Sequence, residues 1–190
     1  SNPGSDAARF SSPEGLCVDF SGNIYVADTG NHRICKWTDQ GDCLGWIGYQ
    51  YGTWQTGITT ASPSGLFGCF SSPRGVFVNA GGSIFVADTN NNRIQVFRQN
   101  GEFVRERILR PLCGAQQNAT WVPKRPCGVE AAFSVALSHD GSQSYLYVAD
   151  GGTHVITVLR RSDLEVVDEF AGPGVAPGQL GRPHNLTVDP

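Results

Sequence analysis

The sequence lacks methionine, long apolar runs and a strong charge of either sign. No stretch approaches the roughly 18 apolar residues that a membrane-spanning helix requires, which excludes such a helix. Only 16% of the residues are charged and the formal net charge is −3, too mild a balance to indicate a nucleic-acid-binding or membrane-binding surface. The absence of methionine, even at position 1, indicates a processed product or a piece of a longer chain.

Glycine and proline, by contrast, are plentiful. The 190 residues include 24 glycines and 11 prolines, a composition typical of many turns and few long helices. A chain of this length can bury the core of one ordinary domain. We therefore expect short elements joined by tight turns.

One short unit recurs along the chain. It reads GNIYVADTGNHRI at residues 22–34, GSIFVADTNNNRI at 82–94 and, more loosely, YLYVADGGTHVI at 145–156. The β-branched and aromatic centre of each copy is typical of a buried strand. The Asp, Asn and Gly residues that follow are typical of a turn, because their side chains bond the local backbone.

The residues around each copy complete a four-stranded antiparallel sheet. A sheet this small cannot bury both of its faces alone, and stacking several around an axis solves that problem. The sequence therefore predicts an all-β fold, a β-propeller with three complete four-stranded antiparallel blades and the first strand of a fourth. We expect a fragment of a larger propeller.

The repeat also sets the expected boundaries. These are a linker or tail of a preceding unit at 1–9, blade 1 at 10–69 with an inserted loop at 48–68, blade 2 at 70–131 with a Cys-containing inserted loop at 112–129, blade 3 at 132–179, and the first strand of blade 4 at 180–190. Insertions in repeat folds usually gather on one face, and that face often binds.

The units resemble NHL repeats over nearly the whole chain, from Phe10 to Pro190. The resemblance is carried by Pro13 and Gly15, by the strand ending in Ala27-Asp28, and by Asn31-His32-Arg33-Ile34, most of which return in the second unit. It implies a β-propeller, often six-bladed, with the first strand of each blade nearest the central channel. It implies no single activity, since NHL propellers serve as protein-binding and RNA-binding modules, cell-surface scaffolds and, in one lineage, a lyase.

Three side chains occupy equivalent positions next to the proline that begins an innermost strand. They are Glu14, Arg74 and His184. Equivalent positions in successive blades point to the same rim of the channel, so the frame is expected to gather an acid, a guanidinium and an imidazole. Such variation at a repeated position is typical of a binding site carried on a scaffold. Ordinary polarity of the rim is the alternative.

His184 also allows an enzyme hypothesis. Pro183-His184-Asn185-Leu186 resembles strand starts in the NHL-type peptidyl-hydroxyglycine amidating lyases, where histidines at such positions bind zinc. A zinc site needs three or four ligands, and the matching positions hold Glu14, which could ligate, and Arg74, which cannot. We therefore expect no cofactor and no enzyme, with the zinc lyase kept as the alternative.

The repeated aspartates Asp28, Asp88 and Asp150 are interpreted as structural. Each follows a strand and precedes a turn, where a carboxylate accepts backbone N–H groups. Arg33 and Arg93 are expected to pair with carboxylates or carbonyls within the frame. The chain has no nucleophile-elbow or phosphate-binding glycine motif.

Six cysteines allow several disulfide pairings. Cys113 and Cys127 lie in one inserted loop, and their pairing is the best supported. Cys43 could pair with Cys35 across a hairpin turn or with Cys69, which would staple the first inserted loop. The second option is preferred, although it leaves Cys17 and Cys35 about 10 Å apart, too far for a bond.

Two sequons, at Asn118 and Asn185, are predicted N-glycosylation sites. Together with the even number of cysteines they favour an extracellular or cell-surface location. We therefore expect a glycosylated structural scaffold or protein-interaction module that uses the inserted loops or the channel rim. Its expected partner is another protein or copies of itself, up to a filament, and not a nucleic acid.

Overall fold

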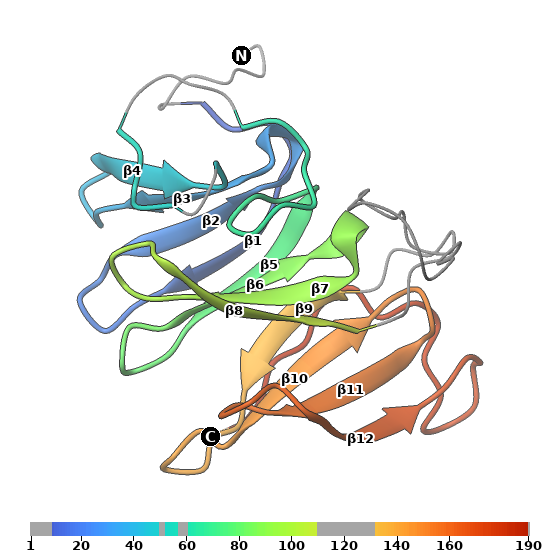
Figure 1. The fold of residues 1–190 in the computed structure, drawn as a ribbon. Coiled ribbons are helices and arrows are strands. Elements are labelled where there is room, and N and C mark those ends of the chain that lie inside the picture. Colours follow the sequence, from blue (N-terminus) through green and yellow to red (C-terminus); the bar gives the residue numbers. More distant parts are fainter. Residues whose placement is uncertain (1–8, 50–51, 57–60, 110–131, 190) are drawn as a thin grey trace, which may run out of the picture.

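A computed structural model describes residues 9–49, 52–56, 61–109 and 132–189 as three four-stranded antiparallel sheets. The strands are β1 Pro13–Val18, β2 Ile24–Asp28, β3 Arg33–Trp37, β4 Cys43–Ile47, β5 Pro73–Val78, β6 Ile84–Asp88, β7 Arg93–Phe97, β8 Phe103–Ile108, β9 Ala132–Leu137, β10 Tyr145–Asp150, β11 Val155–Arg160 and β12 Val166–Ala171. Within each sheet, spatial order follows chain order from the first strand. The sheets fan out from one side like blades (Figure 1).

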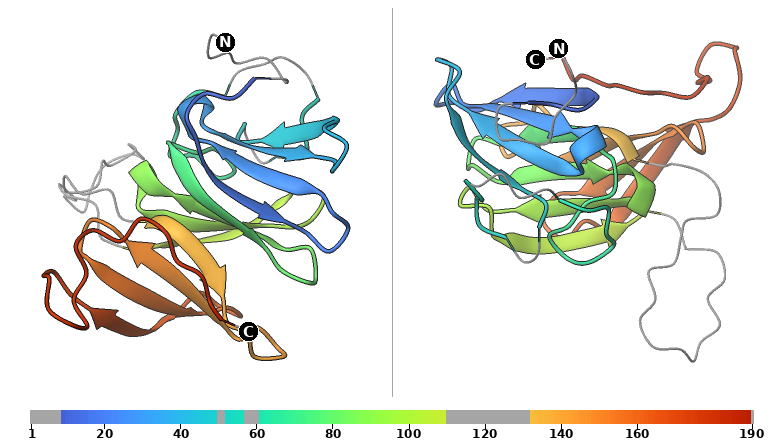
Figure 2. Two further views of the ribbon diagram at one scale, coloured as in Figure 1. Left: turned by 180° about the vertical axis from the view of Figure 1, so that it is seen from behind. Right: turned by 90° about the horizontal axis from the view of Figure 1, so that it is seen from above.

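This architecture confirms the predicted all-β propeller fold with three complete blades. We call the sheets β1–β4, β5–β8 and β9–β12 blades 1, 2 and 3. The sheets stack face to face in the two further views (Figure 2). No helix among the described residues is long and apolar enough to cross a membrane.

Blade 2 shows how stacking buries both faces of a sheet. On β6, Ile84 and Val86 belong to the core shared with blade 1, whereas Phe85 and Ala87 belong to the core shared with blade 3. This division follows from the two-residue period of a strand. All four side chains are at most 2% exposed.

Blade 1 presents the same kind of apolar face without a described neighbour. Leu16 and Val18 of β1 are 68% and 56% exposed, whereas their blade 2 equivalents Val76 and Val78 are 5% and 6% exposed. The difference arises because blade 1 covers Val76 and Val78. The burial of this repeated position therefore depends on the neighbouring blade and not on the residue type.

The predicted first strand of a fourth blade is not a strand in the structure. Residues 181–189 carry no strand assignment, and the preceding Leu180 makes an isolated bridge with Pro173. A strand needs a hydrogen-bonded neighbour, and the described residues offer none to this stretch. The segment instead lies along the innermost strand of blade 3, where Ser134 Oγ donates to Asn185 Oδ1 over 2.9 Å.

Candidate functional site

A buried aspartate–arginine pair fixes the start of the inner strand in blades 1 and 2. Arg33 Nε donates to Asp28 Oδ2 and Arg93 Nε donates to Asp88 Oδ2, each over 2.7 Å. The other oxygen, Oδ1, of each aspartate accepts the backbone N–H that lies two residues before the inner-strand proline, also over 2.7 Å. Both carboxylates are fully buried, so they serve the frame, as the sequence indicated.

Arg33 and Arg93 differ in the additional side chain that each guanidinium group contacts. In blade 2, Arg93 Nη1 also donates to Glu106 Oε2 over 2.7 Å. In blade 1 the equivalent position holds Trp46, and the guanidinium carbon of Arg33 lies 5.8 Å from the centroid of a Trp46 ring. A cation and the face of an aromatic ring attract each other. The repeated arginine therefore has a second carboxylate as an additional partner in blade 2 and an aromatic ring in blade 1.

Polar contacts tie each blade to the start of the next inner strand. Thr29 Oγ1 donates to the carbonyl of Pro73 over 2.7 Å, and Thr89 Oγ1 donates to that of Ala132 over 2.5 Å. His32 Nδ1 accepts the N–H of Ser72 over 3.0 Å. These contacts hold the backbone on which the next rim side chain stands.

One of these ties depends on pH. Burial lowers the pKa of His32 below its ordinary value, and the Asp28 carboxylate partly opposes this. Only the neutral ring can accept the Ser72 N–H, so the contact stabilises the fold above the unfolded pKa of about 6.5 and this stability is lost as pH falls. Urea midpoints at neutral and mildly acidic pH measure the loss.

The matched variant for this prediction is His32→Asn. Asn92 occupies the equivalent position in blade 2 with the same left-handed backbone, φ 51° against 54° for His32. Asparagine tolerates this conformation and does not titrate. The variant is expected to lose less stability on acidification than the parent, and an equal loss would remove His32 as the cause.

Glycines let the inner strands of neighbouring blades approach closely. A Cβ on Gly15 would lie 2.2 Å from the carbonyl oxygen of Arg74, and one on Gly75 would lie 2.9 Å from the Cα of Ser134. Neither space admits a methyl group without a backbone shift. This close approach of β1, β5 and β9 brings the rim side chains of successive blades within reach of one another.

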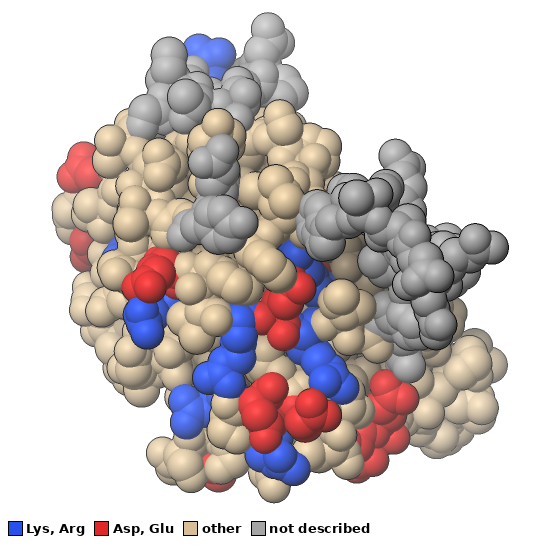
Figure 3. Space-filling model, in the orientation of Figure 1, with Lys and Arg blue, Asp and Glu red and all other residues tan. Residues whose placement is uncertain are grey.

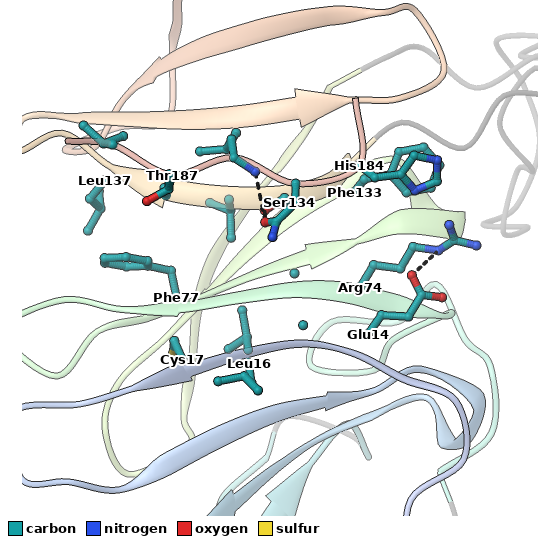
Figure 4. A pocket seen from close by; sticks show the side chains of 18 of the residues that line it. Glu14, Leu16, Cys17, Arg74, Phe77, Phe133, Ser134, Leu137, His184 and Thr187 are labelled. Carbon is teal, nitrogen blue, oxygen red and sulfur yellow. Dashed lines mark hydrogen bonds and ion pairs between the residues drawn. The ribbon is translucent and has the colours of Figure 1, made fainter. Parts of the chain in front are cut away.

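Four rim side chains form a continuous row, which we call the rim row: Glu14, Arg74, Phe133 and His184. Glu14 Oε2 lies 3.4 Å from Arg74 Nε, and the Arg74 guanidinium carbon lies 4.6 Å from the Phe133 ring centroid. The rings of Phe133 and His184 stack with centroids 4.7 Å apart and planes inclined by 14°. Figure 4 shows the row at one end of a cavity.

This axial cavity has a volume of about 730 Å³ and is lined by the three inner strands and the segment 184–188. Leu16, Phe77 and Leu137 contribute apolar walls away from the rim row (Figure 4). The inner strands are the edge strands of their sheets. Their cavity-side backbone groups therefore require water or a polar ligand as partners. The space combines a charged mouth with a partly apolar interior.

Sequence reasoning placed Glu14, Arg74 and His184 on one rim, and the structure brings these three residues into one row. Their role in binding stays a prediction. Reasoning from the proline missed Phe133, because blade 3 begins with Ala132 instead of proline. The strand register could have found it, since Ala132 pairs with Asp150 as Pro13 pairs with Asp28.

The structure tests only some of the predicted disulfides. Cys113, Cys127 and the sequon at Asn118 lie outside the described residues. The preferred Cys43–Cys69 bridge is absent, because Cys43 forms no disulfide within the described residues. Cys43 is exposed at the start of β4, whereas Cys69 is buried beside the blade 2 frame, where its carbonyl accepts from Arg93.

Cys17 and Cys35 are also without a disulfide among the described cysteines. Burial raises the pKa of each thiol to about 12. Cys17 lines the axial cavity, but a thiol with so high a pKa is a poor nucleophile. These two cysteines are therefore best interpreted as small core side chains.

The alternative prediction of a zinc site is not supported in the part of the chain that the structure describes. No group of three or more His, Cys, Asp or Glu residues there could hold a metal ion. His184 stacks on Phe133, and the carboxylate of Glu14 pairs with Arg74. The residues around His184 thus do not fit a zinc centre of three or four ligands.

Charged side chains on the outer surface are mixed in sign. Lys and Arg alternate with Asp and Glu over the face in Figure 3. Exposed pairs include Arg107 with Glu165, whose Nη1 and Oε1 are 3.0 Å apart. The described part of this face therefore offers no broad patch of positive charge of the kind that attracts nucleic acids.

A family model and one curated relative name the same type of repeat. The family model described as "NHL repeat" matches residues 10–37 and 70–97, which contain the first three strands of blades 1 and 2. NHL repeat-containing protein 3 of Homo sapiens is 26% identical over 199 residues, covering 95% of this chain and 45% of that protein. Protein brain tumor of Drosophila melanogaster is 43% identical over 71 residues, covering 37% and 7%.

Solved structures agree at the level of the fold. The inactive H270A virginiamycin B lyase of Staphylococcus aureus matches with a TM-score of 0.56 and 18% identity, covering 93% of this chain and 45% of that chain. The U3-55K structure matches with a TM-score of 0.55 and 15% identity, covering 85% and 39%. The chain thus spans less than half the length of the relatives and structures named here.

Proposed function

The chain belongs to the NHL repeat family, and from that premise we propose that it is a protein-interaction module that binds its partner through the rim row. The observation that carries this proposal is the contrast between frame and rim. The frame residues of blades 1 and 2 repeat with the same bonds. The rim position changes from Glu14 to Arg74 to Phe133 on inner strands of the same register, and His184 adds an imidazole from the segment that follows blade 3.

The chemistry of the rim row supports this choice. Arginine and aromatic side chains are enriched among the residues that dominate protein-binding energy. Here Arg74, Phe133 and His184 stand in contact at the mouth of a cavity of about 730 Å³. A cavity of this size accommodates a few side chains of a partner. An extended segment could also use the edges of β1 and β5.

A random peptide library displayed on phage tests the proposal. Peptides are selected on the parent protein and then measured by fluorescence anisotropy against Phe133→Ser and His184→Ala. We expect both variants to weaken binding by about 10-fold or more. His184→Ala removes a side chain that contacts the peptide, whereas Phe133, which is only 2% exposed, supports the His184 and Arg74 side chains that pack on its ring. The matched control, Arg98→Ser, alters an exposed arginine whose ionic partner among the described residues is its hairpin neighbour Glu102, and this variant is expected to bind as the parent does.

Two results would contradict the proposal. One is a library that yields no enriched peptide. The other is a set of peptides that bind the rim variants as well as the parent, which would move the interaction to the inserted loops. Circular dichroism of each variant verifies that the blades remain folded.

An extracellular, glycosylated scaffold is proposed as the setting of this module. Its support is the two sequons and the even number of cysteines. Asn185 is exposed, as an acceptor must be, and lies on the cavity wall. Expression through a eukaryotic secretory pathway is expected to give a product whose mass falls after glycosidase treatment and in Asn118→Gln. An unglycosylated product would contradict this setting.

Self-association is the second candidate, favoured by the exposed face of blade 1. Leu16, Val18 and Phe20 are 68%, 56% and 86% exposed, and the occupant proposed is blade 3 of a second copy. Blade 3 presents Tyr147 and Ile156 at the positions by which blade 1 covers blade 2. Sedimentation is expected to show concentration-dependent association that Phe20→Ser weakens. A monomer at all concentrations would exclude it.

A further inference from the structure

We propose that His154 is a positioning residue for the rim row, which places His184 by holding the segment 181–189 on blade 3. This inference rests on the proposed function and explains how one member of the rim row reaches its place. The other three members stand on paired inner strands. His184 does not, since residues 181–189 carry no strand assignment. Its position therefore depends on other contacts.

A hydrogen bond from a turn of blade 3 fixes the start of this segment. The backbone N–H of Arg182 donates to His154 Nδ1 over 2.7 Å. Both residues have a left-handed backbone, with φ 62° for Arg182 and 66° for His154, a conformation that most side chains adopt only at a cost. The bond joins these two residues and favours one path of the chain into Pro183 and His184.

The turn that carries His154 is itself fixed to blade 3. Asp150 Oδ1 accepts the backbone N–H groups of Gly152 and Thr153 over 3.0 Å and 2.9 Å. The N–H of His154 donates to the carbonyl of Asp150 over 2.9 Å. Because Asp150 is fully buried, His154 presents its acceptor nitrogen from a well-supported point.

Two further contacts carry the placement on to His184. The His184 ring stacks on Phe133 with centroids 4.7 Å apart, and Gly151 leaves the space for Phe133, because a Cβ on Gly151 would overlap that ring. One residue further, Ser134 Oγ donates to Asn185 Oδ1 over 2.9 Å. His184 thus lies between two hydrogen bonds to blade 3, one before it and one after it.

The same hydrogen bond occurs between blades 1 and 2, where the next strand has more support. His32 Nδ1 accepts the N–H of Ser72, and both residues are left-handed. The strand that follows pairs with β6 and packs in the core shared by the two blades. Every residue of 181–189 is instead exposed or only partly buried. A segment with so little burial has low local stability, so its placement depends more strongly on the histidine.

Nuclear magnetic resonance of the His184 ring tests the placement directly. A ring stacked on phenylalanine has proton signals shifted upfield, and the His184 signals are assigned by their absence in His184→Ala. The matched variants are His154→Gly and His154→Asn. Both new residues tolerate a left-handed backbone, but only asparagine retains a side-chain acceptor. We expect the His184 signals to move toward those of free histidine in His154→Gly and to stay in place in His154→Asn.

The affinity for library-selected peptides tests the consequence for binding. His154→Gly is expected to weaken binding by about 10-fold, as His184→Ala does, and His154→Asn by less than about 2-fold. The double variant of His154→Gly and His184→Ala is expected to bind no more weakly than His184→Ala, because a positioning residue acts through the residue that it positions. A residue that only stabilised the fold would add a loss of its own.

Ser134→Ala is a second variant for the case that circular dichroism shows His154→Gly to be unfolded. It removes the hydrogen bond to Asn185 and leaves His154 in place. The His184 signals are expected to move in the same direction, and binding is expected to weaken by about 2- to 5-fold, the range of one neutral hydrogen bond.

The outcomes are distinguishable from failure of the proposed function. Unchanged His184 signals in His154→Gly, equal signals in His154→Gly and His154→Asn, or additive losses in the double variant would overturn the inference. If His184→Ala weakens binding and His154→Gly does not, the interaction module stands and the role of His154 falls. If His184→Ala binds as the parent does, the proposed function fails at this residue, and the ring signals alone decide whether His154 places His184.

Discussion

Replacement of Asp88 by alanine is expected to lower the free energy of unfolding by about 3–5 kcal/mol, the usual effect of removing one partner from a buried ion pair. Asp88 is fully buried, and Oδ2 accepts from Arg93 Nε over 2.7 Å and from Asn91 Nδ2 over 2.8 Å. Its Oδ1 accepts the N–H of Ser71. The variant leaves these donors buried without this acceptor. Urea unfolding followed by tryptophan fluorescence measures the change.

Asp163→Ala is the control for this experiment. Asp163 also pairs with an arginine, Arg160, over 2.6 Å, but both side chains are more than 40% exposed. An exposed pair contributes about 0–1 kcal/mol, so little change is expected. Equal effects of Asp88→Ala and Asp163→Ala would contradict the interpretation of the repeated aspartates as the centre of the frame.

Gly15→Ala is expected to destabilise the chain by about 1–3 kcal/mol, the range for an overpacked site, and to separate blade 1 from blade 2 at the rim. The new Cβ would lie 2.2 Å from the Arg74 carbonyl oxygen, which belongs to backbone and cannot rotate away. The strands must therefore move apart, and the Glu14–Arg74 pair lengthens with them. Urea unfolding and the affinity of library-selected peptides are both expected to fall.

Gly141→Ala is the matched control. Nothing lies within 4 Å of a Cβ built on Gly141, and its backbone conformation is open to alanine. Its stability and peptide affinity are expected to equal those of the parent. A Gly15→Ala variant as stable and as active as Gly141→Ala would show that the close approach of β1 and β5 does not form the rim row.

Much of the fold could be predicted because the repeat carries redundant information. Strand, turn and frame residues return together at one spacing, so a single interpretation of residues 22–34 also describes 82–94. The same redundancy identified Glu14 and Arg74 as equivalent, because proline and glycine flank both. At these positions the local sequence favours the same strands and turns that the packing of the blades requires, so the local sequence was sufficient to predict them.

The features that could not be predicted depend on contacts with residues that are distant in the sequence. Residues 181–189 have strand-like sequence, but a strand needs a partner, and the described residues supply none. Phe133 escaped prediction because blade 3 lacks the flanking proline, although the pairing of Ala132 with Asp150 keeps the register. The predicted Cys43–Cys69 disulfide was wrong. The prediction assumed that two cysteines at the ends of one inserted loop lie close together, whereas Cys43 lies at the exposed start of β4.

The central claim is that the rim row is the binding surface, and photo-cross-linking tests it most directly. Two versions of the protein carry p-benzoylphenylalanine, one in place of Glu14 on the rim and one in place of Phe67, which is 40% exposed in the inserted loop between blades 1 and 2. Each is irradiated with library-selected peptides, and the products are mapped by mass spectrometry. The account predicts cross-links from position 14 and not from position 67. Cross-links from position 67 alone would contradict it and assign binding to the inserted loop.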